Sequence, residues 1–378
     1  TDLQRHRENI SSQFDQIAFR SPEPDSSSHQ QYSRAWESGF DVDQWTEILR
    51  GENCPDAASV ARHLVQFAEA SATQQVDVVA GERLLRFVPA LLGEVIQTAM
   101  PAVAISRALS VVESVLRRSA YISLLNENRA ALARLVDLCA RSRYIAEQLA
   151  RYPVLLDELL DPNILSGEVT KQQLANEVHQ RLALSDADDS EARILIISQF
   201  QRAAMFRIAV ADFSGALPIM KVSDGLTWLA EVVLSEMLQV AWQDLVARHG
   251  EPTCLVDGTP RNAGFGIIAY GKLGGLELSY GSDLDIVFLH DSCGGRQFTN
   301  GEKPLDNSLF YGRLVRRLVH FLTTQTGSGA LYEVDTRLRP DGHKGLLVTS
   351  TDAFERYQED NAWTWEHQAL LRARPVAG

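Results

Sequence analysis

The pattern of apolar residues changes near Gly250, and this change constrains the fold more than any other feature of the chain. From Trp45 to about Leu160, apolar residues recur at helical spacing, as in LLRFVPALLGEVIQ, which predicts a series of amphipathic helices. Two further helical runs are expected at roughly Ala192–Ala211 and Val222–Arg248. Beyond Gly250 the apolar runs become short and β-rich. The sequence therefore predicts an α+β protein in which a mostly helical N-terminal region precedes an α+β region.

Short segments of the C-terminal region have the composition of strands, and a longer segment between two of them has that of a helix. The helix candidate, NSLFYGRLVRRLVHFLTT, is amphipathic at helical period and follows Asp306 and Asn307 as candidate caps. Near the N-terminus, a short polar helix is expected before Arg20–Gln31, which is rich in Pro, Ser and Asp and is predicted to be a linker. The strand candidates are Gly264–Tyr270, Leu284–His290 and Leu331–Arg339.

The charge and cysteine content argue against several classes of protein. Asp and Glu number 49 against 36 Lys and Arg, a net charge of −13, which disfavours unspecific binding to nucleic acid or to an anionic membrane. No apolar run approaches the ~18 residues of a membrane span, and the polar N-terminus does not have the pattern of a signal peptide. The scattered cysteines form no CxxC pair and are expected to be reduced thiols. A cytoplasmic protein without nucleic-acid or membrane partners is predicted.

Two aspartates, Asp283 and Asp285, are separated by one residue on a predicted strand, so their side chains are expected on the same face. Leu284, Ile286 and Phe288 then point to the opposite face, into a core. Two neighbouring carboxylates repel each other unless a cation lies between them. Hard oxygen ligands of this kind suit Mg²⁺, which proteins share with substrate phosphates. The pair therefore predicts a metal site for phosphate chemistry, although a solvated strand start shows the same pattern.

A glycine-lysine pair stands shortly before these aspartates. Gly271 and Lys272 follow an apolar strand, and the intervening LGGLELSYGS leaves room for a turn and a short helix. A glycine allows the backbone to approach a triphosphate, helix N–H groups favour an anion, and the lysine adds a positive charge. Gly274, Gly275 and Ser282 of the same loop are further candidate ligands of the nucleotide.

Two better-known phosphate motifs overlap this region, and neither fits. Gly264, Gly266 and Ala269 match a dinucleotide fingerprint, but that motif must follow a strand, and here it coincides with one. Gly266–Lys272 spells GxxxxGK, but Leu273 stands where a P-loop has Ser or Thr, and the middle of the run is strand-like. Both interpretations are rejected.

A third carboxylate comes from a separate predicted strand. In LYEVDTRLR the side chains alternate, so that Asp335, Arg337 and Arg339 share one face with Glu333. Asp335 is a candidate metal ligand and a candidate general base for an attacking hydroxyl. The arginines are candidate ligands of phosphate oxygens. For each residue taken alone, an ion-paired strand face with Glu333 is the alternative.

This arrangement resembles the DNA-polymerase-β-like nucleotidyltransferase superfamily, in which an apolar strand and a glycine precede Asp-x-Asp and a later strand supplies another aspartate. Its members usually have Gly-Ser where this chain has Gly271 and Lys272. One family shows the variation found here, and AYGKLGGLELSYGSDLDIVFLH, LYEVDTRLRPDGHKGLLVTS and AWTWEHQALLRAR are similar to its signatures. From about Leu124 to its end, the chain thus resembles the glutamine synthetase adenylyltransferase family, also called the adenylyl-transferring and adenylyl-removing enzymes.

The resemblance implies a domain organisation. A polymerase-β-like nucleotidyltransferase domain with a small mixed sheet and a helical lead-in is expected over 151–378, with its active-site core at about 260–378. An interdomain helix and linker are expected over 1–45, and a helical regulatory or linking region over 46–150. Family members have two related halves, and the signatures here resemble those of the C-terminal, adenylyl-attaching half. We therefore expect this chain to be part of a longer protein.

The resemblance also implies a reaction. A tyrosine hydroxyl of glutamine synthetase attacks the α-phosphorus of ATP and pyrophosphate leaves, which down-regulates nitrogen assimilation. Asp283 and Asp285 would hold two Mg²⁺ ions, and Asp335 would share the metal near the nucleophile and help to deprotonate it. A PII-type signal protein and glutamine are the implied regulators. Trp363 and Trp365 are expected to pack in a core rather than to stack on a base.

Two other functions stay open. The phosphorolytic half, which removes AMP from adenylylated glutamine synthetase, would share all three carboxylates. From a different class, the chain would be a non-catalytic regulatory module whose helical region binds a PII-type signal protein. The intact Asp283, Asp285 and Asp335 argue against a vestigial site.

Overall fold

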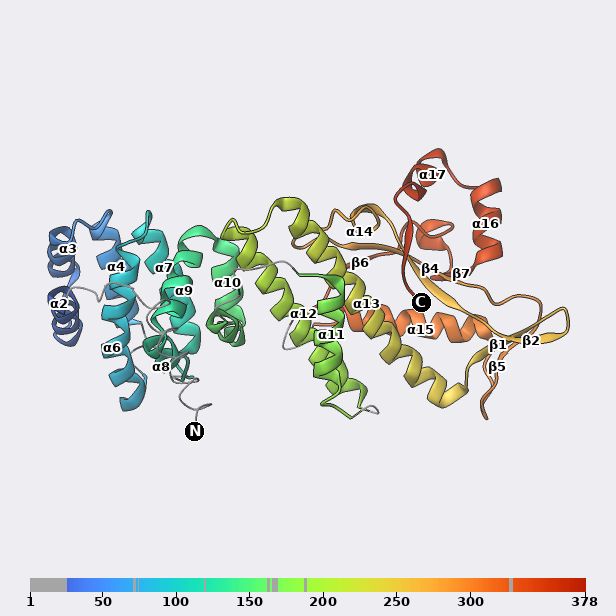
Figure 1. Ribbon diagram of the computed structural model, residues 1–378, viewed down its shortest axis with the longest axis horizontal. Coiled ribbons are helices and arrows are strands. Elements are labelled where there is room, and N and C mark those ends of the chain that lie inside the picture. The colour runs from blue at the N-terminus through green and yellow to red at the C-terminus, as the bar shows by residue number, and fades with distance from the viewer. Residues whose placement is uncertain are drawn as a thin grey trace, which may run out of the picture. The chain divides into compact units, whose positions relative to one another are not determined.

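The chain divides into two compact units, Thr1–Leu160 and Asp161–Gly378. Figure 1 shows the computed structural model of the chain, coloured along its length. The short polar helix expected at the N-terminus lies outside the described residues, as does the beginning of the predicted linker. The structure describes residues 26–70, 73, 75–118, 120–161, 164, 169–186, 189–325 and 329–378.

The first unit is helical throughout its described residues, as its apolar periodicity predicts. Side chains that accept hydrogen bonds from the first turn fix where several helices begin. Asp41 accepts from Gln44 N at 2.9 Å, and Asp77 accepts from Ala80 N at 2.7 Å. The elements are α2 (Ser26–Glu37), α3 (Val42–Gly51), α4 (Ala57–Glu69), α6 (Val78–Val95), α7 (Pro101–Val115), α8 (Ala120–Glu127), α9 (Arg129–Arg141), α10 (Arg143–Arg151) and the 3₁₀-helix η1 (Pro153–Leu160).

Residues 26–31 belong to the predicted linker but form the first half of α2, so the linker prediction is wrong there. The reason lies further along the same helix. Tyr32 is 1 % exposed and Ala35 is fully buried, and the Tyr32 ring lies 6.5 Å from that of Trp45. Because packing of an apolar face supplies most helix stability, this burial outweighs the weak helix propensity of the serine-rich first turn.

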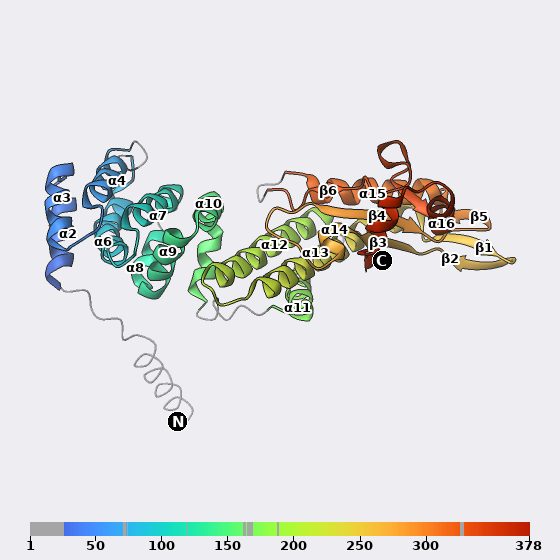
Figure 2. The same ribbon diagram turned by 90° about the horizontal axis from the view of Figure 1, so that it is seen from above.

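The second unit begins with helices and continues into sheets. α12 (Ser190–Phe213) and α13 (Ile219–His249) confirm the two predicted helical runs, and Figure 2 shows them running side by side. The predicted helix behind Asp306 is confirmed as α15 (Asn307–Thr323), with Asp306 Oδ1 accepting from Ser308 N at 2.8 Å. The remaining helices are α11 (Lys171–Leu182), α14 (Gly271–Gly274), η3 (Gly342–Lys344), α16 (Thr351–Asp360) and α17 (Thr364–Leu370).

The strands form a three-stranded and a five-stranded sheet. In the larger sheet, β4 (Leu284–His290) pairs antiparallel with β3 (Phe265–Ala269) and parallel with both β6 (Val334–Asp335) and β7 (Val348–Ser350). β3 also pairs antiparallel with β8 (Arg374–Ala377). This is a small mixed sheet. The smaller sheet, in the order β2-β1-β5, contains β1 (Pro252–Val256), β2 (Thr259–Asn262) and β5 (Gly295–Thr299).

One continuous core joins the long helices to the larger sheet. It contains Leu229 and Met237 of α13, Phe288 of β4 and Leu318 of α15, all fully buried. Within the described residues, one helix, α12, is long and apolar enough to span a membrane, and 61 % of its most apolar window is buried inside the protein. α12 is therefore a core helix of the second unit. The same core holds the larger sheet against α12, α13 and α15.

Candidate active site

The start of β4 carries Asp283 and Asp285. Leu284, Ile286 and Phe288 are fully buried, so the predicted division of the strand into a core face and a carboxylate face is confirmed on the core side. β3 lies beside β4 and adds a backbone bond from Tyr270 N to Asp285 O at 2.8 Å. The backbone of Asp285 is therefore held near the start of β4, and Asp283 lies directly before that strand.

Asp335 reaches the same place through parallel strand pairing. β6 pairs with β4 in a register that sets Asp335 opposite Asp285 and Val334 opposite Leu284. Leu284 N also donates to Glu333 O at 2.9 Å. As a result, carboxylate oxygens of Asp283, Asp285 and Asp335 all lie within 4.8 Å of one another. We call these three residues the acidic triad.

The charges of the acidic triad act on one another. Burial raises the pKa of Asp285, and the neighbouring charges of Asp283 and Asp335 raise it further. The charges of Arg337 and Lys272 oppose this shift. The three carboxylates therefore repel one another in the folded chain, and a bound cation would relieve that repulsion.

Arg337 lies against Asp335. Arg337 N donates to Asp335 Oδ1 at 2.8 Å, and the guanidinium forms an ion pair with Oδ2, with Nε at 2.6 Å. The hydrogen bond from the Arg337 side chain is the main reason why the pKa of Asp335 is lowered. A lowered pKa keeps Asp335 ionised as a ligand and makes it a weaker base. Because the Arg337 side chain is 65 % exposed, it is able to leave Oδ2 for another anion.

The donors of the acidic triad fit Mg²⁺. Each member offers a carboxylate oxygen, the ligand type that Mg²⁺ prefers, and Mg²⁺ is usually held by few protein carboxylates together with substrate phosphates. Asp283, Asp285 and Asp335 would hold the ion, and Arg337 would give up its contact with Oδ2.

α14 brings the glycine-lysine pair to the acidic triad. Gly271 has φ +52°, and a Cβ at this position would lie 2.1 Å from Asp285 Oδ2. The position therefore requires glycine, for its backbone conformation and for its contact with Asp285. The Lys272 side chain is exposed, and its charge lowers the pKa of Asp285. β3 (Phe265–Ala269) occupies most of the two rejected phosphate motifs, so their apolar middle forms a strand and not a loop.

The other predicted ligands, Gly274, Gly275 and Ser282, have contacts with other parts of the protein. A Cβ at Gly274 would lie 2.1 Å from Arg372 O, so this glycine permits close packing of α14 against the backbone before β8. Gly275 ends α14, and its N–H bonds to Gly271 O at 3.0 Å. Ser282 Oγ lies 2.9 Å from Ser279 Oγ in the turn that leads into β4.

The predicted strand Leu331–Arg339 is wrong outside Val334–Asp335, because the chain turns at Thr336. Arg339 is consequently not on a strand face with Arg337. It is 7 % exposed, and its Nη1 donates to Thr336 O at 2.8 Å and to Thr336 Oγ1 at 2.7 Å. Its Nε donates to Gly345 O at 3.3 Å. The guanidinium binds oxygens of the loop after Asp335, and its contact with phosphate stays a prediction.

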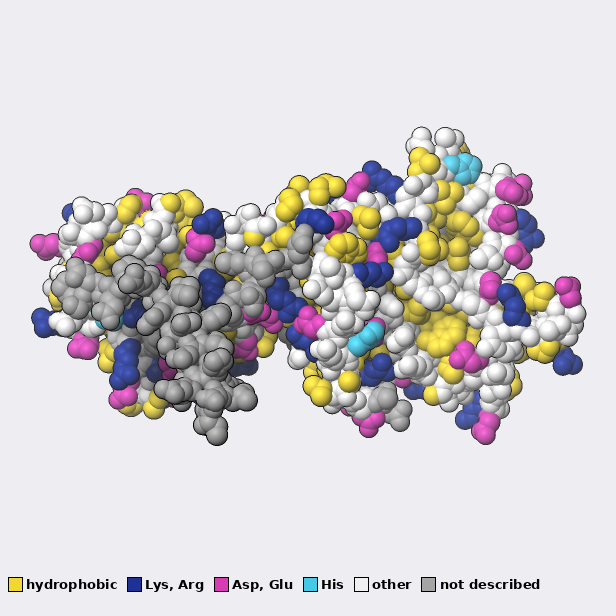
Figure 3. Space-filling model, in the orientation of Figure 1, with side chains coloured by type: hydrophobic (Ala, Val, Ile, Leu, Met, Phe, Trp, Pro, Cys, Tyr) yellow, Lys and Arg dark blue, Asp and Glu magenta, His cyan; other side chains and the backbone are white. Residues whose placement is uncertain are grey.

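The prediction that Trp363 and Trp365 pack in a core is wrong. They are 71 % and 54 % exposed, and Figure 3 shows hydrophobic side chains at the surface around α17. The buried side chain of this short helix is Glu366, which accepts from Trp363 N at 2.8 Å and from Tyr357 OH at 3.1 Å. Because the Glu366 side chain is the one that turns inward, Trp363 and Trp365 face solvent.

Sequence analysis assigned no role to Arg374, the last residue of the AWTWEHQALLRAR signature, yet its side chain supports α14. Its Nε and Nη2 donate to Gly274 O and Leu273 O, both at 2.9 Å. The contact spans about a hundred residues of sequence, so no local pattern indicates it.

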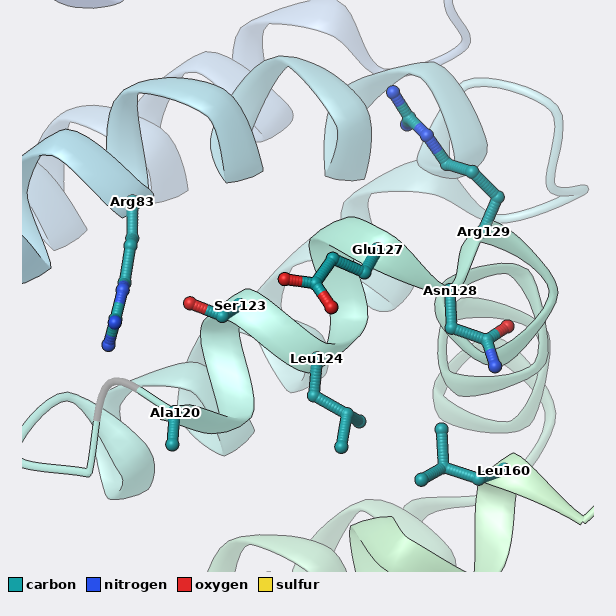
Figure 4. A pocket seen from close by; sticks show the side chains of 8 residues that line it. All are labelled: Arg83, Ala120, Ser123, Leu124, Glu127, Asn128, Arg129 and Leu160. Atoms are coloured by element: carbon teal, nitrogen blue, oxygen red, sulfur yellow. The ribbon is translucent and has the colours of Figure 1, made fainter.

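A separate cavity of about 730 Å³ lies in the helical unit. Figure 4 shows the Arg83 side chain extending from α6 towards α8, which carries Ser123 and Glu127. The cavity is lined by none of the residues predicted to bind metal or phosphate. The lining residues are Arg83, Ala120, Ser123, Leu124, Glu127, Asn128, Arg129 and Leu160.

Comparison with known proteins identifies relatives of the whole chain. A protein of Thioalkalivibrio sulfidiphilus named bifunctional glutamine synthetase adenylyltransferase/adenylyl-removing enzyme is 46 % identical over 385 aligned positions, covering 100 % of this chain and 40 % of the relative. Proteins of the same name from Pseudomonas putida and Pseudomonas aeruginosa are each 47 % identical, covering 92 % and 91 % of this chain and 35 % of either relative. The chain therefore spans less than half the length of the curated relatives that it matches.

A sequence profile gives the same result. The profile described as glutamate-ammonia ligase adenylyltransferase matches residues 132–378, which contain the acidic triad, α14 and the whole second unit. The matched residues are more than half of the chain, and the relatives cover all or nearly all of it. The chain belongs to the glutamate-ammonia ligase adenylyltransferase family.

Proposed function

We propose that the second unit is a nucleotidyltransferase domain that transfers AMP from ATP to a tyrosine hydroxyl of glutamine synthetase, with release of pyrophosphate. One observation carries the proposal: parallel pairing of β4 and β6 gathers three carboxylates into an acidic triad whose oxygens lie within 4.8 Å of one another. The names of the relatives supply the substrate protein and the transferred group.

In this proposal Asp283, Asp285 and Asp335 would hold two Mg²⁺ ions, which would neutralise phosphate charge and make a coordinated hydroxyl more acidic. That help is needed because an unperturbed tyrosine has a pKa near about 10. Lys272 is exposed beside Asp285, and Arg337 is exposed beside Asp335, so both are proposed ligands of the triphosphate. The lowered pKa of Asp335 favours its role as a metal ligand over its role as the base.

The test is AMP transfer from labelled ATP to purified glutamine synthetase by the chain. Asp283→Asn and Asp335→Asn are each expected to lower transfer by at least about a hundredfold, because each removes a charged ligand. Asp257→Asn is the matched control. Asp257 lies in the two-residue turn between β1 and β2 with φ 50°, a conformation that Asn adopts readily, so transfer is expected to stay unchanged. Undiminished transfer by either triad variant would refute the assignment.

The opposite direction is the second candidate, because the relatives' names include an adenylyl-removing activity. Adenylylated glutamine synthetase incubated with phosphate would then yield ADP. The similarity of SDLDIVFLHD and WTWEHQAL to the attaching half favours AMP transfer as the main direction. Formation of ADP without any AMP transfer would reverse that choice.

Regulation completes the proposal. A PII-type signal protein and glutamine are the proposed regulators, and the cytoplasm is the proposed location. Transfer measured with and without each effector tests whether this chain contains what they require. If the rate of AMP transfer is the same with every combination of the two effectors, regulation requires other parts of the longer relatives.

A further inference from the structure

We infer that Glu231, a buried residue of α13, is a positioning residue for the acidic triad, and that it acts through Arg374 and α14. This inference rests on the proposed function, because it concerns how the chain prepares the same metal site. It assigns a role to a carboxylate to which sequence analysis gave none.

Glu231 is a buried charge with two cationic partners. Its side chain is 3 % exposed, and it forms ion pairs with Arg374 of β8 and with Lys171 of α11, the latter at 2.5 Å. Removing the partner of a buried charge leaves that charge uncompensated, so such a pair restricts the positions of both side chains. Glu231 therefore fixes where the Arg374 guanidinium lies.

Arg374 transmits this restraint to α14. Its two donors bind the carbonyl oxygens of Leu273 and Gly274, each at 2.9 Å. α14 spans only Gly271–Gly274, so it has few internal hydrogen bonds and its last carbonyls need outside donors. The planar guanidinium fork suits two neighbouring carbonyls, whereas a lysine would offer a single point of charge.

α14 in turn limits Asp285. Gly271, at its first position, leaves so little space that a Cβ would lie 2.1 Å from Asp285 Oδ2. A shift of α14 would therefore change the space available to the Asp285 carboxylate and move the Lys272 charge relative to it. The sequence of contacts runs from Glu231 to Arg374, then to α14, and then to Asp285.

A second buried glutamate of the same helix provides the matched control. Glu236 is 4 % exposed and, like Glu231, pairs with a residue of α11, since its Oε1 lies 2.9 Å from His179 Nε2. The contacts of Glu236 run to α11, whereas those of Glu231 run to both α11 and Arg374. For Arg374, the control is Arg261 of β2, which forms an exposed pair with Asp291 at 3.0 Å.

The first measurement uses the metal-free chain. Amide hydrogen exchange of Gly274 and Gly275, whose N–H groups bond to Tyr270 O and Gly271 O, reports opening of α14. Glu231→Gln and Arg374→Gln are expected to accelerate exchange of these amides by about tenfold or more. Glu236→Gln and Arg261→Gln are expected to leave them unchanged. Equal acceleration of amide exchange by Glu231→Gln and Glu236→Gln would mean that Glu231 only stabilises α13 in general. That result would overturn the inference.

The second measurement is binding of Mn²⁺ in the presence of ATP, followed by electron paramagnetic resonance. Loss of residues that orient metal ligands typically weakens metal affinity by about 10- to 100-fold, and that range is expected for Glu231→Gln and Arg374→Gln. The double variant is expected to match Arg374→Gln alone, because Glu231 acts through Arg374. Additive losses, or full affinity in Glu231→Gln, would overturn the inference.

These measurements separate the two proposals. If the chain binds Mn²⁺ with ATP but transfers no AMP to glutamine synthetase, the proposed function fails while the positioning role of Glu231 still stands or falls on the exchange and binding data. If the unaltered chain binds no Mn²⁺ with ATP, both proposals are refuted.

Discussion

The helical unit and the second unit are determined by different ranges of interaction. In the helical unit, the helices are set by their own apolar faces and, for several of them, by a side-chain cap within the first turn, as at Asp41 and Asp77. In the second unit, the acidic triad exists only because β6 pairs with β4 across about fifty residues of sequence. Local patterns therefore predict the first unit well, whereas the candidate site depends on pairing that no local pattern contains.

The largest expected effect tests whether the site depends on the core of the second unit. Phe288→Ala removes a fully buried ring from the middle of β4 and is expected to lower the free energy of unfolding of that unit by about 3–5 kcal/mol. Chemical denaturation followed by the tryptophans of each unit measures it. A loss below about 1 kcal/mol would show that β4 is not central to the core.

The next effect concerns the site and not the core. Gly271→Ala forces a left-handed conformation on alanine and a Cβ into contact with Asp285, so AMP transfer is expected to fall by about a hundredfold. Gly258→Ala is the control, because Gly258 also has a positive φ but has open space around its Cβ position. Equal losses of transfer in the two variants would attribute the effect to backbone strain alone.

A smaller effect should stay within the helical unit. Asp41→Ala removes the cap of α3 and is expected to cost about 1 kcal/mol of the stability of that unit. Mn²⁺ binding by the acidic triad should not change. Weaker Mn²⁺ binding would contradict the independence of the two units that the comparison assumes.

The last expected effect is a pH dependence of the second unit. Burial lowers the pKa of His290, whose ring stacks on Tyr311 at 4.6 Å between centroids. A histidine kept neutral by folding contributes stability that is present above its unfolded pKa of about 6.5 and is lost as pH falls towards its folded pKa. We expect a loss of at most about 1.4 kcal/mol per pH unit below pH ~6.5, and a shallower slope in His290→Gln. Identical slopes would contradict this assignment.

The sequence predicts the parts of the second unit that depend on local patterns. β4 has the predicted bounds, α15 begins behind the predicted Asp306 cap, and Leu284, Ile286 and Phe288 form the predicted core face. These features follow from periodicity and from capping, which act over a few residues.

Two of the errors occur beside buried charged side chains, Arg339 and Glu366, because apolar periodicity and composition do not indicate burial of a charge. Arg339 fits a strand by alternation, but the chain turns at Thr336 and its guanidinium binds loop carbonyls. Trp365 looks like a core residue by composition, yet the buried Glu366 fixes the opposite face of α17. The hairpin of β1 and β2 was not predicted, although Asp257 and Gly258 are a typical two-residue turn and were a signal that could have been used.

The short ladder between β4 and β6 limits how the chain can vary in length. Only two residue pairs join these strands, and Asp335 meets Asp285 in a single register. A slip of one position would bring Val334 or Thr336 opposite Asp285, and neither side chain is a carboxylate. An inserted or deleted residue should therefore be tolerated better in the exposed loop before α15, where surrounding segments can absorb it. The same change between Tyr332 and Asp335 would move the Asp335 carboxylate out of the acidic triad while leaving the composition of the chain almost unaltered.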